Sequence, residues 1–304
     1  MNRGLLVTGA TGFIGGHVIR AALARGDIVW AWSRNSPRAS RKLPAEVRVV
    51  ETLAEIPATE RIDAIVNLAG APVIGPPWTR ARRQLLIDSR VKTTAAVIAW
   101  CTTRTQRPAV LISASAIGFY GPAGDNWLDE NSPSQPVFQS QLCLAREAAA
   151  DAAAHLGIRV VNLRIGLVLG ADGGIFTRLE IPAKFGLAAR IGDGRQWMSW
   201  VHIDDVVRIV ELAIDDPSLN GPINAVAPAP ARQGDFQREL TRALHRPLWM
   251  WIPGGVLRLA LGEMAELLVQ GQRVTPRRLL EAGFVFRHAT LAAAIEELVR
   301  PARS

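Results

Sequence analysis

Short apolar runs alternate with longer segments of helical spacing along most of this 304-residue chain. The runs expected to form strands begin at Leu5 and recur at Ile28–Trp32, Val47–Val50, Ala64–Leu68, Ala109–Ser113 and Val160–Ile165. Between them, segments such as Arg80–Thr102 and Gln139–Leu156 carry apolar residues at helical spacing. This alternation predicts an α/β fold, a Rossmann doubly wound parallel sheet covered by helices.

Proline and glycine become frequent between Asn220 and Gly234, which predicts a crossing into a second lobe. We expect a Rossmann domain over residues 1–220, with substrate-side segments from about residue 166 on, and a smaller C-terminal substrate lobe over residues 221–304. In that lobe, Gly262–Arg278 begins with helical apolar spacing, and an amphipathic helix is expected near Leu291–Val299.

The first apolar run ends in a glycine-rich turn, TGATGFIG, that opens a helical segment reaching roughly Arg25. In such a turn, Gly9 allows the sharp bend, Gly12 lets backbone amides approach a pyrophosphate, and Gly15 lets the helix pack close to the sheet. The amides at the start of the helix then face the phosphates. The strand, turn and helix together predict a dinucleotide site that includes Gly9, Thr11, Gly12, Phe13 and Ile14.

The residues after the second strand indicate which dinucleotide binds. An acidic residue there would hold the ribose hydroxyl of NAD, but this chain has Ser33 and Arg34, with Arg38 and Arg41 close behind. A hydroxyl and a guanidinium suit a 2′-phosphate, which a carboxylate would repel. These residues favour NADP, the alternative being a solvated arginine-rich loop.

Composition excludes several other classes. Of the 35 cationic residues only Lys42, Lys92 and Lys184 are lysines, and the arginines are spread along the chain without a nucleic-acid-binding motif, despite a net charge of +8. No stretch approaches the ~18 apolar residues of a membrane span, and the start resembles no signal peptide. Cys101 and Cys143 have no paired spacing, so we expect no metal site. The expectation is a cytoplasmic protein, monomer or homodimer, that binds neither nucleic acid nor membrane.

Several segments resemble a known family. The motifs TGATGFIG, NLAGA, SASAIGFYG, LRIGLVLG and WVHIDDVV occur in the order seen in extended short-chain dehydrogenases/reductases, the sugar-nucleotide epimerase-like group. The segments RPLWMWIP, LRLALGEMAELLVQGQRVTPRRLLEAGFVF and TLAAAIEEL resemble the C-terminal domain of uncharacterised function in one atypical branch. That branch is described as NAD-dependent epimerase/dehydratase or, historically, cell-division inhibitor. The resemblance covers nearly the whole chain.

The resemblance implies further contacts with NADP. Besides the glycine turn, Ser33 and Arg34, these are Leu68, Ala69 and Gly70 of NLAGA, Arg90 of the IDSR segment, and Val168 of GLVLG. Leu68 and Val168 are alternatively ordinary core residues, and Arg90 is alternatively a surface ion-pair residue.

The chain departs from the family pattern at the catalytic helix. Typical members use Tyr-x-x-x-Lys there, because the lysine lowers the tyrosine pKa and holds the nicotinamide ribose. Aligning this helix on Glu147 places Gln139 and Cys143 at those two positions. The single tyrosine, Tyr120, is followed four residues later by Gly124, so the motif is absent from the whole sequence.

Three residues remain candidates for proton chemistry. Ser115 stands where the family has its hydroxyl donor, Tyr120 follows in the next loop, and Glu130 could supply a carboxylate, although it could also be a turn or helix-cap acid. His202 more often opens a helix in a WVHIDD segment than acts in catalysis. For Gln196 and Trp197, the sequence favours equally a place in the lining of a pocket and a place in the core.

Two function classes follow. One is an NADP(H)-binding oxidoreductase or epimerase-like enzyme that acts on a small carbonyl or sugar-like substrate without the Tyr-x-x-x-Lys pair. The other is an NADP-binding sensor or interaction protein without turnover. Retention of pocket-type loops favours the enzyme, whereas the missing pair favours the sensor.

Overall fold

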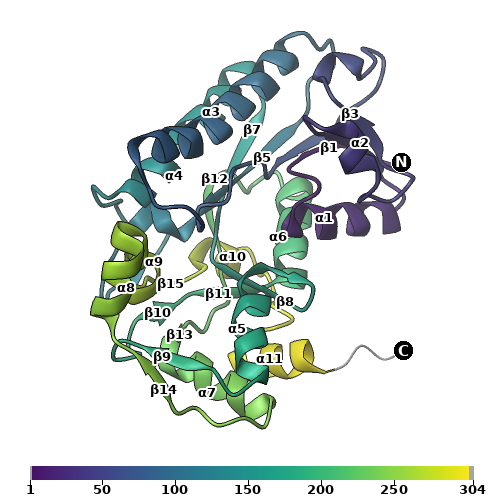
Figure 1. The fold of residues 1–304 in the computed structure, drawn as a ribbon. Coiled ribbons are helices and arrows are strands. Elements are labelled where there is room, and N and C mark those ends of the chain that lie inside the picture. The colour runs from purple at the N-terminus through teal and green to yellow at the C-terminus, as the bar shows by residue number, and fades with distance from the viewer. Residues whose placement is uncertain (1, 301–304) are drawn as a thin grey trace.

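A seven-stranded parallel sheet forms the larger lobe (Figure 1). The structure is a computed structural model that describes residues 2–300. The strand order is β12-β7-β5-β4-β1-β2-β3, so the order reverses between β1 and β4. The strands are β1 (Gly4–Thr8), β2 (Ile28–Trp32), β3 (Arg48–Val50), β4 (Ala64–Asn67), β5 (Val110–Ala116), β7 (Arg159–Ile165) and β12 (Gly221–Ala225). The predicted Rossmann fold is confirmed.

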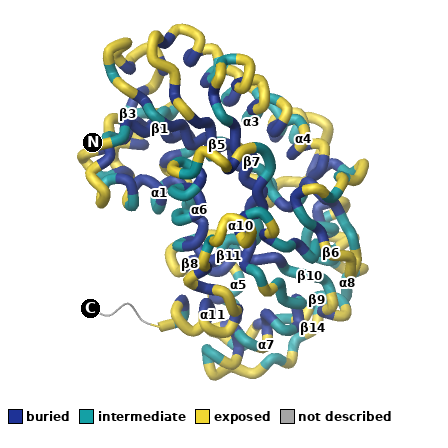
Figure 2. The backbone as a smooth tube through the Cα atoms, turned by 180° about the vertical axis from the view of Figure 1, so that it is seen from behind, coloured by how far each residue is buried: buried dark blue, intermediate teal, exposed yellow. Residues whose placement is uncertain are grey.

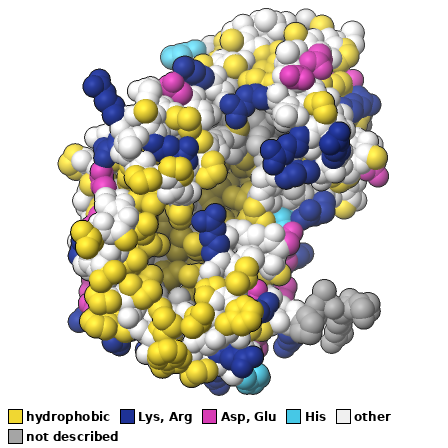
Figure 3. Space-filling view, in the orientation of Figure 1, with side chains coloured by type: hydrophobic (Ala, Val, Ile, Leu, Met, Phe, Trp, Pro, Cys, Tyr) yellow, Lys and Arg dark blue, Asp and Glu magenta, His cyan; other side chains and the backbone are white. Residues whose placement is uncertain are grey.

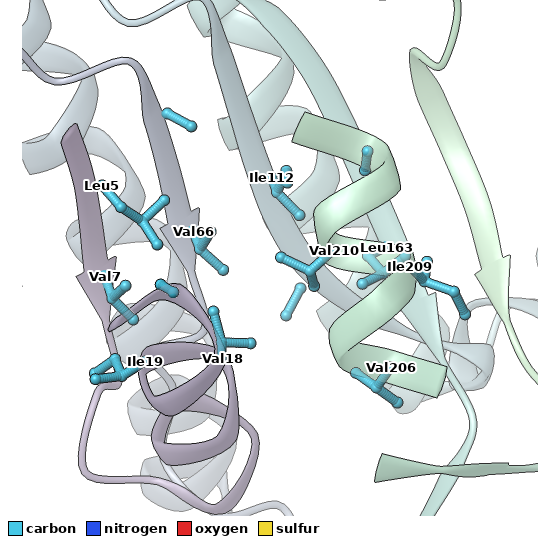
Figure 4. Close-up of a cluster of buried hydrophobic side chains, with 14 of the residues drawn as sticks. Leu5, Val7, Val18, Ile19, Val66, Ile112, Leu163, Val206, Ile209 and Val210 are labelled. Atoms are coloured by element: carbon cyan, nitrogen blue, oxygen red, sulfur yellow. The ribbon is translucent and has the colours of Figure 1, made fainter. Parts of the chain in front are cut away.

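Helices cover both faces of this sheet. Helices α1 (Phe13–Ala24) and α6 (Ile203–Asp215) pack beside each other on one face, and α3 (Arg80–Thr102) and α4 (Phe138–Asp151) on the other. Figure 4 shows side chains of α1 and α6 directed toward those of the strands. A sheet buried on both faces reads as continuous apolar runs, which is why the strands were visible in the sequence. Figure 2 shows the buried sheet and the exposed outer faces of the helices.

The smaller lobe consists of two-stranded sheets and short helices. Its strand pairs are β8 (Leu167–Gly170) with β11 (Trp200–His202), β9 (Ala189–Ile191) with β14 (Met250–Ile252), β10 (Trp197–Met198) with β13 (Ala231–Arg232), and β6 (Trp127–Leu128) with β15 (Arg273–Val274). Its helices are α5 (Gly174–Lys184), α7 (Gln233–Ala243), α8 (Gly254–Leu261), α9 (Glu266–Val269) and α11 (Leu291–Val299). Helix α10 (Arg277–Glu281) packs against β12 of the large sheet. Elsewhere lie α2 (Ser36–Ser40) and the 3-10 turns η1 (Leu53–Glu55), η2 (Ile117–Tyr120), η3 (Ala152–Leu156) and η4 (Gly262–Ala265).

The chain passes between the lobes more than once. Strand β12 follows the expected boundary at residue 220 yet pairs with β7 in the large sheet, whereas β8 to β11 precede that boundary and lie in the smaller lobe. The boundary therefore does not coincide with a break in the sheet. Both lobes border the region beyond the carboxyl ends of the parallel strands, where ligands of such sheets bind. Within residues 2–300, no helix has both the length and the apolar character needed to cross a membrane.

Candidate active site

A groove of about 1120 Å³ lies at the carboxyl ends of β1, β2 and β4. We call it the cofactor groove. Its walls include nearly all residues that the sequence suggested for the dinucleotide's phosphate and adenosine end, namely Gly9, Thr11, Gly12, Ser33, Arg34, Leu68, Ala69 and Gly70. Helix α3 forms the opposite wall through residues such as Gln84, Asp88 and Lys92, which the sequence did not single out.

The glycine turn is packed too closely for side chains. Gly9 has a φ of +68°, and a Cβ there would lie 2.7 Å from the carbonyl carbon of Leu68. A Cβ at Gly15 would lie 2.4 Å from the carbonyl oxygen of Gly9. Gly12 is the N-cap of the 12-residue helix α1. Because glycine has no side chain, no N-cap side chain accepts from the first amides of the helix. The cradle therefore fits a pyrophosphate at a helix N-terminus.

The adenosine end of the groove carries positive charge. Ser33 and the exposed Arg34 line it directly after β2. The carboxylate that lines the groove, Asp88, belongs to α3 and is paired with Lys92 at 2.9 Å, so it leaves no unpaired negative charge near Arg34. This end fits a 2′-phosphate better than a free ribose diol.

The cofactor groove continues inward past Phe13, Ile14 and Val168. The Phe13 ring packs against the turn between β8 and α5, where a Cβ at Gly170 or Gly173 would lie within 2.6 Å of it. Phe13 thus joins the two lobes at the inner end of the groove. Ile14 and Val168 line both this stretch and the cavity beyond it, so the two hollows are continuous.

That inner cavity has a volume of about 500 Å³ and lies between the lobes. Figure 3 shows hydrophobic side chains along the hollow that separates them. Ser115 borders the inner cavity at the end of β5, with Gln139 and Cys143 beside it on α4. Burial raises the pKa of the Cys143 thiol, so the thiol stays protonated at neutral pH. Gln196 and Trp197 line the same cavity from the smaller lobe.

Ser115 is held by a buried ion pair. Its hydroxyl donates to Glu147 over 2.6 Å, and Arg164 donates to both carboxylate oxygens of Glu147 at 3.0 and 2.9 Å. Both charged side chains are at least nine-tenths buried. Because the hydroxyl hydrogen points toward Glu147, the oxygen lone pairs are left to face the cavity.

Tyr120 lies on the far side of the same network and is fully buried. Its hydroxyl donates to Asn224 over 2.7 Å and accepts from Arg164 at 3.1 Å. Burial raises its pKa to about 12. The phenol borders neither the cofactor groove nor the inner cavity. This environment does not favour proton donation by Tyr120, whose catalytic role remains an untested prediction; in the structure the phenol joins β12 to the Arg164 pair.

Glu130 is likewise part of the interior. One carboxylate oxygen accepts from the backbone amide of Asn224 at 3.0 Å and from that of Arg278 at 3.4 Å. Burial raises its pKa, and the side chain lines neither hollow. Its candidate catalytic role likewise remains an untested prediction, and in the structure Glu130 links the C-terminal segment to the sheet.

Two arginines approach the inner cavity from its cofactor side. Arg90 donates to the carbonyl oxygens of Leu86 and Ala71 and does not line the cofactor groove, so its expected contact with NADP remains a prediction. Arg146 is buried and donates to the carbonyl oxygen of Asn67 over 2.6 Å. The sequence did not point to Arg146, because an arginine on a helix usually signals a solvated face.

His202 opens α6, as a WVHIDD segment predicts. Its Nδ1 accepts from the amide of Asp204 at 3.2 Å, and its ring lies 3.7 Å from that of His288, centroid to centroid. Donor atoms of His202, Asp204 and His288 lie within 4.8 Å of one another. The two rings are tilted by 37° to each other, and Nδ1 of His202 already accepts from the helix, so we assign no metal to this cluster.

Fold, glycine cradle and motif order define an extended short-chain dehydrogenase/reductase. The chain belongs to the NAD-dependent epimerase/dehydratase family, whose model matches residues 5–225. A second model, described as a domain of unknown function (DUF1731), matches residues 252–298. The resemblance drawn from the motifs is confirmed over both parts.

Relatives cover the full length. The chain is 37% identical over 295 residues to epimerase family protein Mb2239 of Mycobacterium bovis, covering 97% of each chain. It is 34% identical over 300 residues to epimerase family protein YfhF of Bacillus subtilis, again covering 97% of each. The crystal structure of human epimerase family protein SDR39U1 with NADPH has 31% identity, a TM-score of 0.86, and coverage of 97% of this chain and 98% of that one.

Proposed function

We propose that this protein is an NADP(H)-dependent oxidoreductase that acts on a small carbonyl-type substrate bound in the inner cavity. The observation that carries the proposal is the continuity of the two hollows: Ile14 and Val168 border both, so a cofactor in the groove would present its reactive end to the cavity. When bound, NADPH supplies a hydride. Reduction of a carbonyl then consumes that hydride and one proton, and yields an alcohol and NADP⁺.

NADP rather than NAD is proposed because Ser33 and Arg34 line the adenosine end. The human relative that was solved with NADPH supports this choice. At the other end, Ser115 contacts the reacting oxygen. On substrate binding its hydroxyl turns from Glu147 to donate to that oxygen, and the proton that the product takes up comes from water rather than from a tyrosine.

The proposal is tested with purified protein in two steps. Calorimetry measures NADPH and NADH affinity, and then a panel of aldehydes, ketones, imines and nucleotide sugars is screened for NADPH oxidation. We expect tighter binding of NADPH and sustained turnover with at least one small carbonyl or imine, with turnover reduced by ~10² in Ser115→Ala. Tight NADPH binding with no turnover across the panel would support the sensor alternative instead.

A further inference from the structure

The charged side chains that the described residues contribute to the lining of the inner cavity are both positive. Of its lining residues, the ionised ones are Arg90 and Arg146. Arg146 donates to the carbonyl oxygen of Asn67 at the end of β4, and Arg90 to that of Ala71, which lines the cofactor groove. Of the residues that the structure describes, no aspartate, glutamate, lysine or histidine lines this cavity. Apolar side chains and glutamines make up most of the rest, with glutamines at positions 139, 196, 233, 237, 270 and 272.

Neither arginine has a carboxylate partner among residues 2–300. Arg146 donates to the carbonyl oxygen of Asn67 and, at 3.5 Å, to the hydroxyl of Ser113; Arg90 is bonded to backbone carbonyls and to the Ser89 hydroxyl. Neutral acceptors of this kind leave the positive charges uncompensated. Burying an unpaired charge is costly, and buried charges are normally paired.

The two guanidinium groups also oppose each other. Burial first, and then the charge of Arg90, lower the pKa of Arg146 to about 9. Burial is also the main cause of the lowered pKa of Arg90. An anion placed between or beside the two groups would relieve both effects, because it compensates the charge and accepts their remaining N–H donors.

Resting on the function proposed above, we propose that the substrate is an organic anion. Its one carboxylate or similar group binds to Arg90 and Arg146, and its apolar body fills the cavity. The pyrophosphate of the cofactor has its own donors at the start of α1, and neither arginine lines the cofactor groove. The anion that the arginines lack is therefore a group of the substrate.

The residues that line the cavity from the smaller lobe refine the class of substrate. They include Leu179, Met198 and Leu267, and also Gln237, whose buried side-chain carbonyl oxygen has no hydrogen-bond partner within the described part of the chain. A neutral donor such as a hydroxyl or amine would satisfy it. Because the described residues of the smaller lobe add no cation to the lining, the cavity disfavours a nucleotide diphosphate, whose phosphates carry several negative charges.

The test measures binding, so it does not depend on turnover. Protein saturated with NADP⁺ is titrated with short aliphatic and aryl carboxylates and with the primary amides of the same acids, followed by calorimetry. We expect at least one carboxylate to bind ~10-fold or more tightly than its amide, about 1.4 kcal/mol. Arg146→Met is expected to remove this preference, and Arg146→Lys to retain part of it, with the affinity for NADPH changed less than threefold in both.

Arg104→Met is the matched control. Arg104 is also buried and donates to backbone carbonyls, but it lies against Trp100, away from the cavity. It should keep the carboxylate preference whatever its effect on stability. If Arg146→Met does not fold, Arg146→Gln, which keeps a neutral donor for the carbonyl oxygen of Asn67, provides the same comparison.

Three results would overturn the proposal: equal affinity for acid and amide, no binding by any member of the series, or a loss of NADPH affinity in Arg146→Met as large as the loss of carboxylate affinity. The last result would assign the arginines to the cofactor. If only the oxidoreductase proposal is wrong, the protein will show no turnover but will still bind the carboxylate more tightly than its amide. That result differs from all three above.

Discussion

The cofactor groove and the inner cavity meet at the same edge of the sheet but are built differently. The groove depends on backbone within one short turn, where Gly9, Gly12 and Gly15 leave room for phosphates. The cavity depends on side chains from α3, α4, β5 and distant parts of the smaller lobe. A site made of local backbone has a sequence signature, whereas a site made of long-range side-chain contacts has none.

The largest expected effect tests the local nature of the groove. In Gly15→Ala the new Cβ would lie 2.4 Å from the carbonyl oxygen of Gly9, so the turn must shift. We expect NADPH affinity to fall ~100-fold or more, about 2.7 kcal/mol, by calorimetry. Gly16→Ala is the neighbouring control, because its Cβ would approach only the end of the Arg20 side chain, at 3.7 Å. That variant should bind normally and gain up to about 1 kcal/mol in helix stability. Equal losses in both variants would contradict the assignment.

The next test distinguishes a residue near the cavity that stabilises the fold from one that takes part in the proposed reaction. Tyr120→Phe leaves Asn224 without its donor and removes an acceptor from Arg164, so we expect a loss of about 2 kcal/mol in the free energy of unfolding, measured in urea. Any turnover should stay within threefold of wild type. Ser115→Ala should do the reverse, with lower turnover and a smaller stability loss. A Tyr120→Phe variant that is as stable as wild type but has lost turnover would support the tyrosine as proton donor.

The adenosine end of the groove is tested by Arg34→Ala. Loss of one charge-assisted contact should weaken NADPH binding ~10-fold, about 1.4 kcal/mol, and leave NADH binding unchanged. Arg41→Ala removes an exposed arginine that does not line the groove and should have no effect on either cofactor. An unchanged preference in Arg34→Ala would remove the basis for choosing NADP.

The smallest effect concerns a contact between distant segments. Burial, and then the nearby His288, lower the pKa of His202 below its usual value. Near and below pH 6.5 the unfolded chain therefore takes up a proton that folded His202 resists. Stability should fall as the pH drops from about 7 to 5, because protonation of His202 favours the unfolded chain. His202→Asn can still cap α6 and should flatten this part of the curve in urea titrations. An unchanged pH dependence would exclude His202 as its source.

The fold was accessible to prediction because β1, β2, β4, β5 and β7 are buried on both faces and separated by long helices. The later segments were less clear: Gly262–Arg278 has helical spacing at its start but forms η4, α9 and the strand β15, with a helix resuming only at Arg277. Short elements of this kind take their structure from packing against other segments, here β6 and α8. The spacing of apolar residues within the segment therefore could not show where helix ends and strand begins.

By itself, the sequence determined the glycine cradle, the positive adenosine end and the absence of a Tyr-x-x-x-Lys motif, since each depends on residues close together in the chain. Only the tertiary structure decided that Tyr120 bonds to Asn224, 104 positions away, and that Ser115 is held by Glu147. It also brought Arg146 to the cavity without a counter-ion. A side chain's environment is set by which segments pack around it, and that packing is a property of the whole fold.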